Sequence, residues 1–168
     1  MSSLSQPFPD VFLSTLSNGQ YFIGDLFQRK FGSPAPAYGE SVIAFYRKTP
    51  LHFLPLCHMN YLQHDELLLS GGAMTNGAVF HEMPPSLAEQ IRLAGGIYFH
   101  LIKYAFDYFG NNYEAIFGYA GDERALEVDL AAGYEATPYP FLISYFHKPV
   151  SQERKQFLIE KAHKLGPF

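Results

Sequence analysis

An arginine followed by a glycine pair is the first group of residues whose types and spacing could do chemistry. Two residues separate Arg92 from Gly95, and Gly96 follows directly. Backbone N–H groups at the beginning of a helix bind phosphate oxygens, glycine permits the close approach, and arginine adds positive charge. The segment with Arg92, Ala94, Gly95 and Gly96 therefore predicts a pyrophosphate site. The alternative is a packing kink inside one continuous helix, where two glycines would cost about 2 kcal/mol relative to alanine.

Two aspartates and an alanine form the second group, downstream of the first. Asp122, Ala125 and Asp129 are spaced three and then four residues apart, so on a helix they share one face. The sequence predicts such a helix, capped by Asp122 and ended by Gly133, with Tyr134 directly after it. We therefore expect the three side chains to contribute to one surface.

Histidines at positions 52, 58 and 64, beside Cys57, are a candidate metal site. On a continuous strand, successive members of this set would lie about 20 Å apart, which is too far for one ion unless a hairpin brings two together. Cys57 and His58 would point to opposite faces, so activation of the thiol is not expected. No serine lies in a Gly-x-Ser-x-Gly context. The sequence therefore predicts no metal site and gives no support to hydrolase chemistry.

The composition restricts the class of protein. Of 168 residues, 48% are hydrophobic and 17% are charged, as in compact domains. The net charge is −4 without a large Lys/Arg cluster, which disfavours nucleic acid and anionic membranes as partners. No run of about 18 apolar residues and no secretory signal is present, and the single cysteine cannot form an internal disulfide. We therefore expect a single cytoplasmic domain over residues 1–168.

The elements that must position these residues change character along the chain. Residues 1–40 predict a helical lead with two short helices between Pro9 and Phe31. Residues 41–147 predict the core, and residues 148–168 an added C-terminal helix from Ser151 to Leu165. The strands of the core share β-branched and aromatic residues, and they are expected at Ser41–Tyr46, Leu51–Leu62, Glu66–Ala73, Ala78–Met83, Tyr113–Ala120 and Pro138–His147.

A long apolar helix is expected between the fourth and fifth of these strands, from Ser86 to about Phe109. A strand, a crossover helix and a parallel strand form a unit with a crevice beside it, where ligands bind. If Gly95 belongs to a phosphate site, this helix must be broken or kinked there. The pattern as a whole predicts a mixed α/β fold of the α+β-like type, with a central mixed sheet flanked by helices.

The two groups of residues together resemble the GNAT superfamily of N-acetyltransferases. In that family an Arg/Gln-x-x-Gly-x-Gly/Ala segment binds the coenzyme A pyrophosphate, and a later Asn-x-x-Ala-x-x-x-Tyr helix lines the thiol end. Arg92 and Gly95 match the first signature, whereas Ala125 and Gly133-Tyr134 match the second. By the same resemblance, the strand Ala78–Met83 would hold the pantetheine arm.

Three positions depart from the family pattern. Ile97 stands where the family has Gly or Ala, Asp122 replaces the usual Asn, and Asp129 replaces the Tyr that protonates the departing thiolate. An ionised Asp129 would repel a thiolate, so it can donate a proton only if burial raises its pKa. Alternatively, Asp129 orients a cationic acceptor in the crevice.

The resemblance implies an acyl-CoA-dependent N-acyltransferase that uses a coenzyme A thioester, acetyl-CoA or a longer acyl-CoA, and acts by direct attack of an amine. Glu82, on the expected pantetheine strand, would remove the proton of the amine. The alternative is a catalytically silent GNAT-fold module that binds a ligand or forms oligomers. The 16 Phe and 12 Tyr residues suggest a site for a greasy small-molecule amine or acyl substrate, or a homodimer interface.

Overall fold

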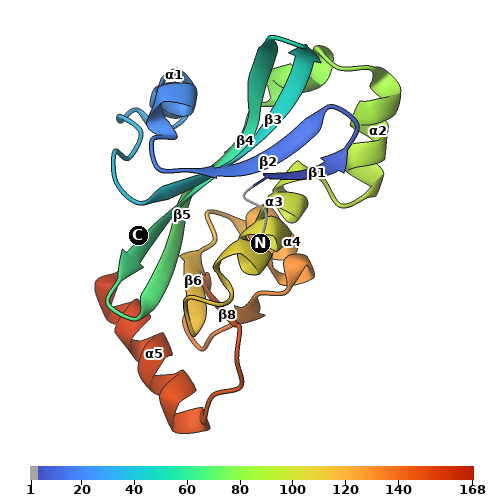
Figure 1. The fold of residues 1–168 in the computed structure, drawn as a ribbon. Coiled ribbons are helices and arrows are strands. Elements are labelled where there is room, and N and C mark those ends of the chain that lie inside the picture. Colours follow the sequence, from blue (N-terminus) through green and yellow to red (C-terminus); the bar gives the residue numbers. More distant parts are fainter. Residues whose placement is uncertain (1–3) are drawn as a thin grey trace.

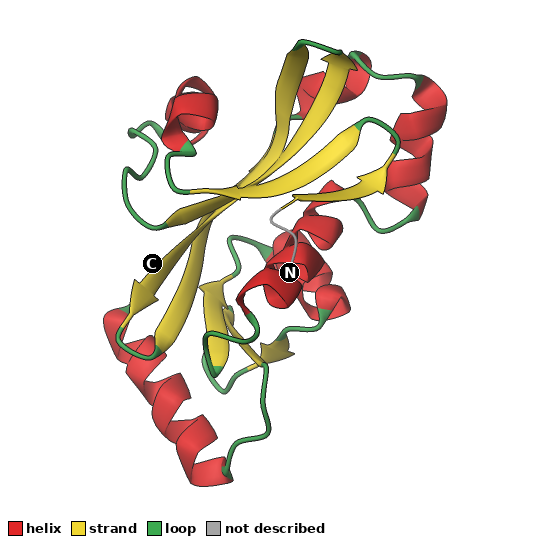
Figure 2. Cartoon of the chain, in the orientation of Figure 1, coloured by secondary structure: helices red, strands yellow, loops and turns green. Residues whose placement is uncertain are grey.

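The structure is a computed structural model that describes residues 4–168, and its centre is one eight-stranded sheet (Figures 1 and 2). The strand order is β1-β2-β3-β4-β5-β6-β8-β7, and only β5 and β6 pair in parallel. The strands are β1 (Leu4–Phe8), β2 (Val11–Leu16), β3 (Glu40–Thr49), β4 (His52–His64), β5 (Leu67–Thr75), β6 (Ala115–Tyr119), β7 (Glu135–Ala136) and β8 (Leu142–Phe146). The expected mixed α/β fold with a central mixed sheet is confirmed.

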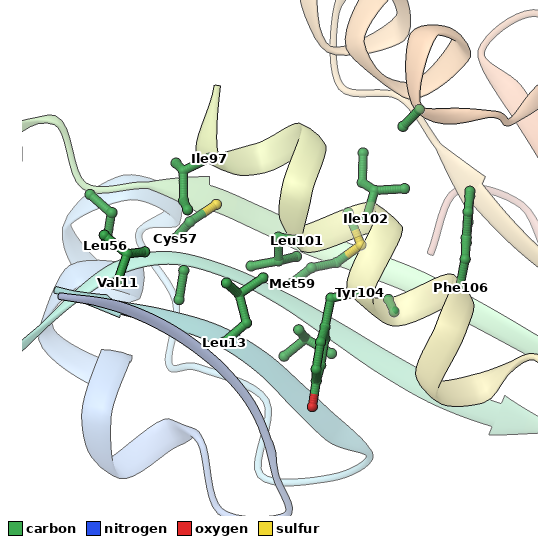
Figure 3. Close-up of a cluster of buried hydrophobic side chains, with 14 of the residues drawn as sticks. Val11, Leu13, Leu56, Cys57, Met59, Ile97, Leu101, Ile102, Tyr104 and Phe106 are labelled. Atoms are coloured by element: carbon green, nitrogen blue, oxygen red, sulfur yellow. The ribbon is translucent and has the colours of Figure 1, made fainter. Parts of the chain in front are cut away.

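Helices cover both faces of this sheet. They are α1 (Gln20–Phe31), α2 (Pro85–Leu93), α3 (Ile97–Phe109), α4 (Glu123–Ala132) and α5 (Gln152–Leu165), with a short 3₁₀ helix η1 (Gly77–His81). Leu101 and Ile102 of α3 are completely buried in the main core (Figure 3). Val42 of β3 belongs to the same core. The next residue, Ile43, packs with Ile23 of α1 instead. Because successive strand residues point to opposite faces, α1 and α3 lie on opposite sides of the sheet.

The C-terminal helix α5 closes a second core on the face opposite α3. Leu158 packs with Leu67 and Leu69 of β5, whereas Leu68 belongs to the core under α3. Ion pairs hold the polar edge of α5 to the rest of the chain, among them Arg154 to Glu114 and Lys161 to Glu66. This is the helix that the sequence predicts beyond residue 148. Within residues 4–168, no helix has the length and apolar character needed to cross a bilayer.

The first part of the chain is a correction to the expected helical lead. Residues 11–16 are strand β2, paired with β1 and β3, and only the second predicted helix forms, as α1. In β2, Val11 and Leu13 are buried whereas Phe12 and Ser14 are half-buried. That two-residue period indicates a strand. The near-helical spacing combined residues of two different elements, which is why the prediction of a first helix was wrong.

The predicted strand Ala78–Met83 is also wrong. Its first residues form η1, and only Val79 within that element is buried. The chain turns directly after β5, because the backbone N–H of Asn76 donates to the carbonyl of Leu56 and its side-chain amide donates to that of Pro55. Strand β4 continues to His52, but the Asn76 side chain occupies the carbonyl of Pro55, and Pro55 has no N–H to donate. The ladder therefore ends at Asn76, and the β propensity of the residues that follow has no effect.

Candidate active site

A crevice of about 1270 Å³ opens where two central strands separate. The parallel pairing of β5 and β6 runs from Leu67↔Ala115 to Ser70↔Gly118 and stops there, while β5 continues to Thr75 beside β4. Figure 1 shows the two strands diverging. The second half of β5, the segment between α2 and α3, and the first half of α4 line the crevice. The crossover from β5 to β6 therefore creates a crevice, with β5 in the place predicted for a strand over Ala78–Met83.

The long predicted helix is broken at the glycine pair, which is the outcome that a phosphate site requires. Helix α2 ends at Leu93 and α3 begins at Ile97, with φ of 99° at Gly95 and 87° at Gly96. The N–H groups of both glycines donate to carbonyls of α2, at 3.2 Å to Arg92 and 2.9 Å to Ile91. The amides available for a ligand are thus those of the first turn of α3, which have no acceptor within their own helix. Gly95, Gly96 and Ile97 all line the crevice.

Arg92 lies at the rim of the crevice and is already ion-paired. Its guanidinium donates two hydrogen bonds to the carboxylate of Glu89, at 2.7 and 2.6 Å. Both side chains are more than half exposed, so the pair is screened by solvent and can exchange partners. Ala94 is not among the described residues that line the crevice; its carbonyl accepts a hydrogen bond from Nε2 of His100 at 3.0 Å.

Helix α4 forms as predicted and turns one face to the crevice. The Asp122 carboxylate caps the helix by accepting from the backbone N–H of Ala125 at 2.8 Å, and Gly133 ends it with φ of 119°. Asp122, Ala125 and Asp129 all line the crevice. Arg124 lines it too, as a cation that the sequence reasoning did not single out. The structure thus brings the two predicted groups of residues to one cavity.

Asp129 is the deepest acid of the crevice. It is 2% exposed, and its Oδ1 accepts a hydrogen bond from the hydroxyl of Tyr98 at 2.8 Å. Burial raises the pKa of Asp129 to about 6, although the bond from Tyr98 opposes this shift. Burial and the neighbouring carboxylate also raise the pKa of Tyr98. The sequence did not identify Tyr98 as a site residue, because several neighbouring aromatic residues of α3 belong to the core. Only the packing of α3 on α4 brings its hydroxyl to Asp129.

Glu82 does not join this group. It follows η1, where it is half-exposed and forms an ion pair with Lys48 of β3. The bond from that ammonium lowers the pKa of Glu82, and the residue is not among the described residues that line the crevice. Its predicted position on a pantetheine strand was wrong, because that segment is not a strand.

A bulge in β5 supplies polar backbone to the crevice. Asn60 of β4 is paired with Gly71 and His58 with Met74, so Gly72 and Ala73 stand opposite Met59 alone. Gly72 has a φ of 63°, which favours glycine. Both bulge residues line the crevice, on the part of β5 that β6 has left. Bulges re-aim backbone groups beside active sites, and a sequence pattern of Gly71-Gly72 alone did not reveal this one.

The histidines near Cys57 do not assemble. No cluster of three or more His, Cys, Asp or Glu side chains that could hold a metal ion occurs within residues 4–168. Cys57 is buried with its thiol 3.4 Å from the hydroxyl of Thr75, and burial raises its pKa to about 11. A thiol with so high a pKa is a poor nucleophile.

Comparisons with known proteins find similarity in structure and none in sequence. No family model and no curated protein matches the sequence. The crystal structure of a protein from Lactobacillus plantarum, assigned as an N-acetyltransferase, superposes with a TM-score of 0.52 at 13% identity, over 83% of this chain and 100% of that chain. A GNAT-family acetyltransferase from Bacillus anthracis gives a TM-score of 0.44 at 10% identity, over 84% and 97% of the two chains. With the split sheet and the broken helix, the first superposition identifies the fold: the chain has the GNAT acetyltransferase fold in a divergent sequence.

Proposed function

We propose that the protein transfers an acyl group from a coenzyme A thioester to an amine by direct attack. The observation that carries this proposal is the separation of β5 from β6, which leaves polar backbone of β5 facing a crevice of about 1270 Å³. A coenzyme A thioester combines an anionic pyrophosphate, an arm with two amides and an activated acyl group. The crevice holds a matching group for each part: helix amides and arginines for the pyrophosphate, a free strand edge for the arm, and a buried carboxyl group near the acyl end.

The residues at the mouth fit the pyrophosphate. A Cβ added at Gly96 would meet open space, whereas one at Gly95 would lie 3.2 Å from the ring of Phe99. The first turn of α3 is therefore open to a ligand on the Gly96 side. The amides of that turn donate hydrogen bonds to phosphate oxygens. Arg92 and Arg124 line the crevice and supply positive charge. Arg92 would leave the carboxylate of Glu89 to contact the phosphate.

The residues deeper in the crevice would perform the chemistry. The unpaired side of β5 from Gly71 to Thr75 binds the amides of the arm, and a bulge N–H polarises the thioester carbonyl. Asp129, with a pKa of about 6, is ionised at neutral pH and attracts the ammonium form of the acceptor. Because that pKa is near neutrality, Asp129 can also take the proton of the amine. The amine nitrogen, after giving one proton to Asp129, attacks the carbonyl carbon. The carbon–sulfur bond breaks, and the coenzyme A thiolate leaves with its electron pair and takes up the second proton of the amine, without a covalent enzyme intermediate.

The proposal is tested by incubating the protein with acetyl-CoA and longer acyl-CoA thioesters together with a panel of small amines. We expect amine-dependent release of the coenzyme A thiol and, by mass spectrometry, an acylated amine. Asp129→Asn should lower turnover more than it changes the affinity for coenzyme A. The absence of thiol release with every amine would contradict the proposal.

A second candidate, a catalytically silent binding module, has one observation in its favour. Asp129 stands where the resembled family carries tyrosine, and a buried carboxylate stabilises a departing thiolate poorly. If the unmodified protein binds coenzyme A without turnover and Asp129→Tyr creates activity, this second candidate is correct.

A further inference from the structure

His58 is the one histidine that is buried among residues 4–168, and the chemistry proposed above does not use it. It is 1% exposed and lies on β4, with its ring 6.2 Å from that of Phe27 in an edge-on contact. Phe27 belongs to α1, so the imidazole lies on the sheet face opposite α3. A buried imidazole needs partners for both nitrogens, and the partners of His58 connect it to the bulge of β5.

The two hydrogen bonds of His58 fix its tautomer. Nδ1 lies 3.2 Å from the carbonyl oxygen of Gly72, and Nε2 lies 3.2 Å from the hydroxyl of Ser41. A carbonyl only accepts, so Nδ1 carries the proton and donates it to Gly72. Burial lowers the pKa of His58 to about 4, so the ring is neutral at physiological pH. Nε2 therefore accepts from the hydroxyl of Ser41, which also lies 3.5 Å from Oδ1 of Asn60.

The carbonyl of Gly72 determines where the next amide points. A trans peptide unit is planar, with its C=O and N–H directed to opposite sides, and the described chain contains no cis peptide bond. Because the Gly72 carbonyl points to His58, the N–H of Ala73 points away from His58. Ala73 has no partner in the register of β4, and it lines the crevice. The carbonyl of Ala73 is held separately by Nζ of Lys30, at 3.5 Å.

We propose that His58 is a positioning residue, which holds the Gly72 carbonyl so that the Ala73 N–H is aimed at the carbonyl oxygen of the bound thioester. This inference rests on the proposed function and adds the residue that orients its hydrogen-bond donor. Negative charge develops on that oxygen as the amine attacks, so the donor matters more in the transition state than in the bound substrate. Loss of His58 should therefore lower kcat and leave KM for acyl-CoA nearly unchanged.

The test compares three variants with the unmodified protein. His58→Phe keeps a ring against Phe27 and removes both hydrogen bonds. His58→Asn places an amide N–H near the position of Nδ1, the atom that bonds to Gly72. Ser41→Ala removes the partner of Nε2 and a 3.5 Å contact of the same hydroxyl with Oδ1 of Asn60. We expect His58→Phe to lower kcat about 10- to 100-fold, with His58→Asn and Ser41→Ala within a few-fold of the unmodified protein.

A spectroscopic measurement separates positioning from a general loss of structure. With acetyl-CoA labelled with ¹³C at the thioester carbonyl, infrared spectra should show a lower carbonyl stretching frequency in the unmodified protein than in water. That shift should be lost in His58→Phe while coenzyme A affinity is retained. If His58→Phe fails to fold, ¹⁵N NMR of the unmodified protein replaces it. There the Nδ1–H tautomer of His58 is expected, together with an Ala73 amide shift caused by acetyl-CoA and absent with coenzyme A.

The experiments distinguish a wrong role for His58 from a wrong proposed function. If the unmodified protein turns over acetyl-CoA and His58→Phe keeps both kcat and the infrared shift, the role of His58 is wrong and the proposed function stands. An Ala73 amide that does not respond to acetyl-CoA likewise overturns it. If the unmodified protein neither binds nor consumes acyl-CoA, the proposed function fails, and the inference about His58 fails with it.

Discussion

At the scale of single residues, the crevice combines groups that stabilise the fold with groups that cost stability. Asp122 caps α4, whereas Asp129 is a carboxylate in a nearly closed environment with one hydrogen bond. Groups whose burial shifts the pKa towards neutrality cluster at functional sites. The sequence identified Asp129 by its spacing from Ala125, but its partner Tyr98 is close only because α3 packs on α4.

Asp129 should make stability fall as pH rises. Its folded pKa of about 6 lies above the ordinary value of 3.8 for an aspartate, so the neutral form favours folding and this contribution is lost between about pH 4 and pH 6. The shift of about two pKa units corresponds to about 3 kcal/mol. Asp129→Asn, which can still accept from Tyr98, should therefore be more stable than the unmodified protein at pH 8 and no more stable at pH 3.5.

Urea unfolding at several pH values measures this difference. Asp107→Asn, at an exposed position of α3, is the matched control and should change the free energy of unfolding little at any pH. Parallel pH profiles for the unmodified protein and Asp129→Asn would show that the Asp129 carboxyl is not perturbed.

Arg92 and Glu89 should affect coenzyme A binding in opposite directions. Arg92→Ala removes a charge-assisted contact worth about 1.5 to 3 kcal/mol, so affinity should fall about tenfold or more. Glu89→Gln removes the carboxylate that occupies the guanidinium, and affinity should rise. Calorimetric titration of coenzyme A into both variants is the measurement. Affinities equal to that of the unmodified protein in both cases would mean that Arg92 does not contact the phosphates.

At the scale of elements, the break between α2 and α3 was predictable because glycine and arginine signals coincide there. Gly95 and Gly96 both have positive φ, a conformation that glycine alone adopts readily. The bulge of β5 was not predictable, because its position depends on the register with β4. Glu82 was misplaced for a related reason: whether an apolar stretch such as Ala78–Met83 becomes a strand depends on tertiary contacts, and here the Asn76 side chain ends the pairing with β4 at Pro55.

Gly96→Ala should destabilise the protein through backbone strain. A Cβ at Gly96 would touch nothing within 4 Å, but φ is 87°, and such a conformation costs about 1 to 3 kcal/mol for other residues. Gly24→Ala is the matched control, since Gly24 also has open space and lies within α1. Alanine there should add up to about 1 kcal/mol. Denaturant unfolding compares the two, and a neutral Gly96→Ala would show that the break is not held in this conformation.

At the scale of the whole molecule, helices cover both faces of the sheet, and the crevice opens between two of its strands. The sheet is packed by α3 on one side and by α1 and α5 on the other, and β5 and β6 part between these layers. The sequence predicts a parallel pair across a crossover helix, but with Ala78–Met83 as its first strand. Which strand forms the pair, and how far the pairing extends, depends on tertiary packing. The fold survives at 13% identity to a solved N-acetyltransferase-like structure, which agrees with the rule that folds tolerate changes in their sites.

The most direct test of the account is calorimetric titration of acetyl-CoA into the unmodified protein and two variants of α4. Ala125 is half-buried and lines the crevice, whereas Ala131 is exposed on the same helix and is not among the described lining residues. We expect one acetyl-CoA site per chain, which is lost in Ala125→Phe, because the new ring would fill the crevice, and kept in Ala131→Phe. No binding to the unmodified protein, or equal binding to Ala125→Phe, would contradict the assignment of this crevice as an acyl-CoA site.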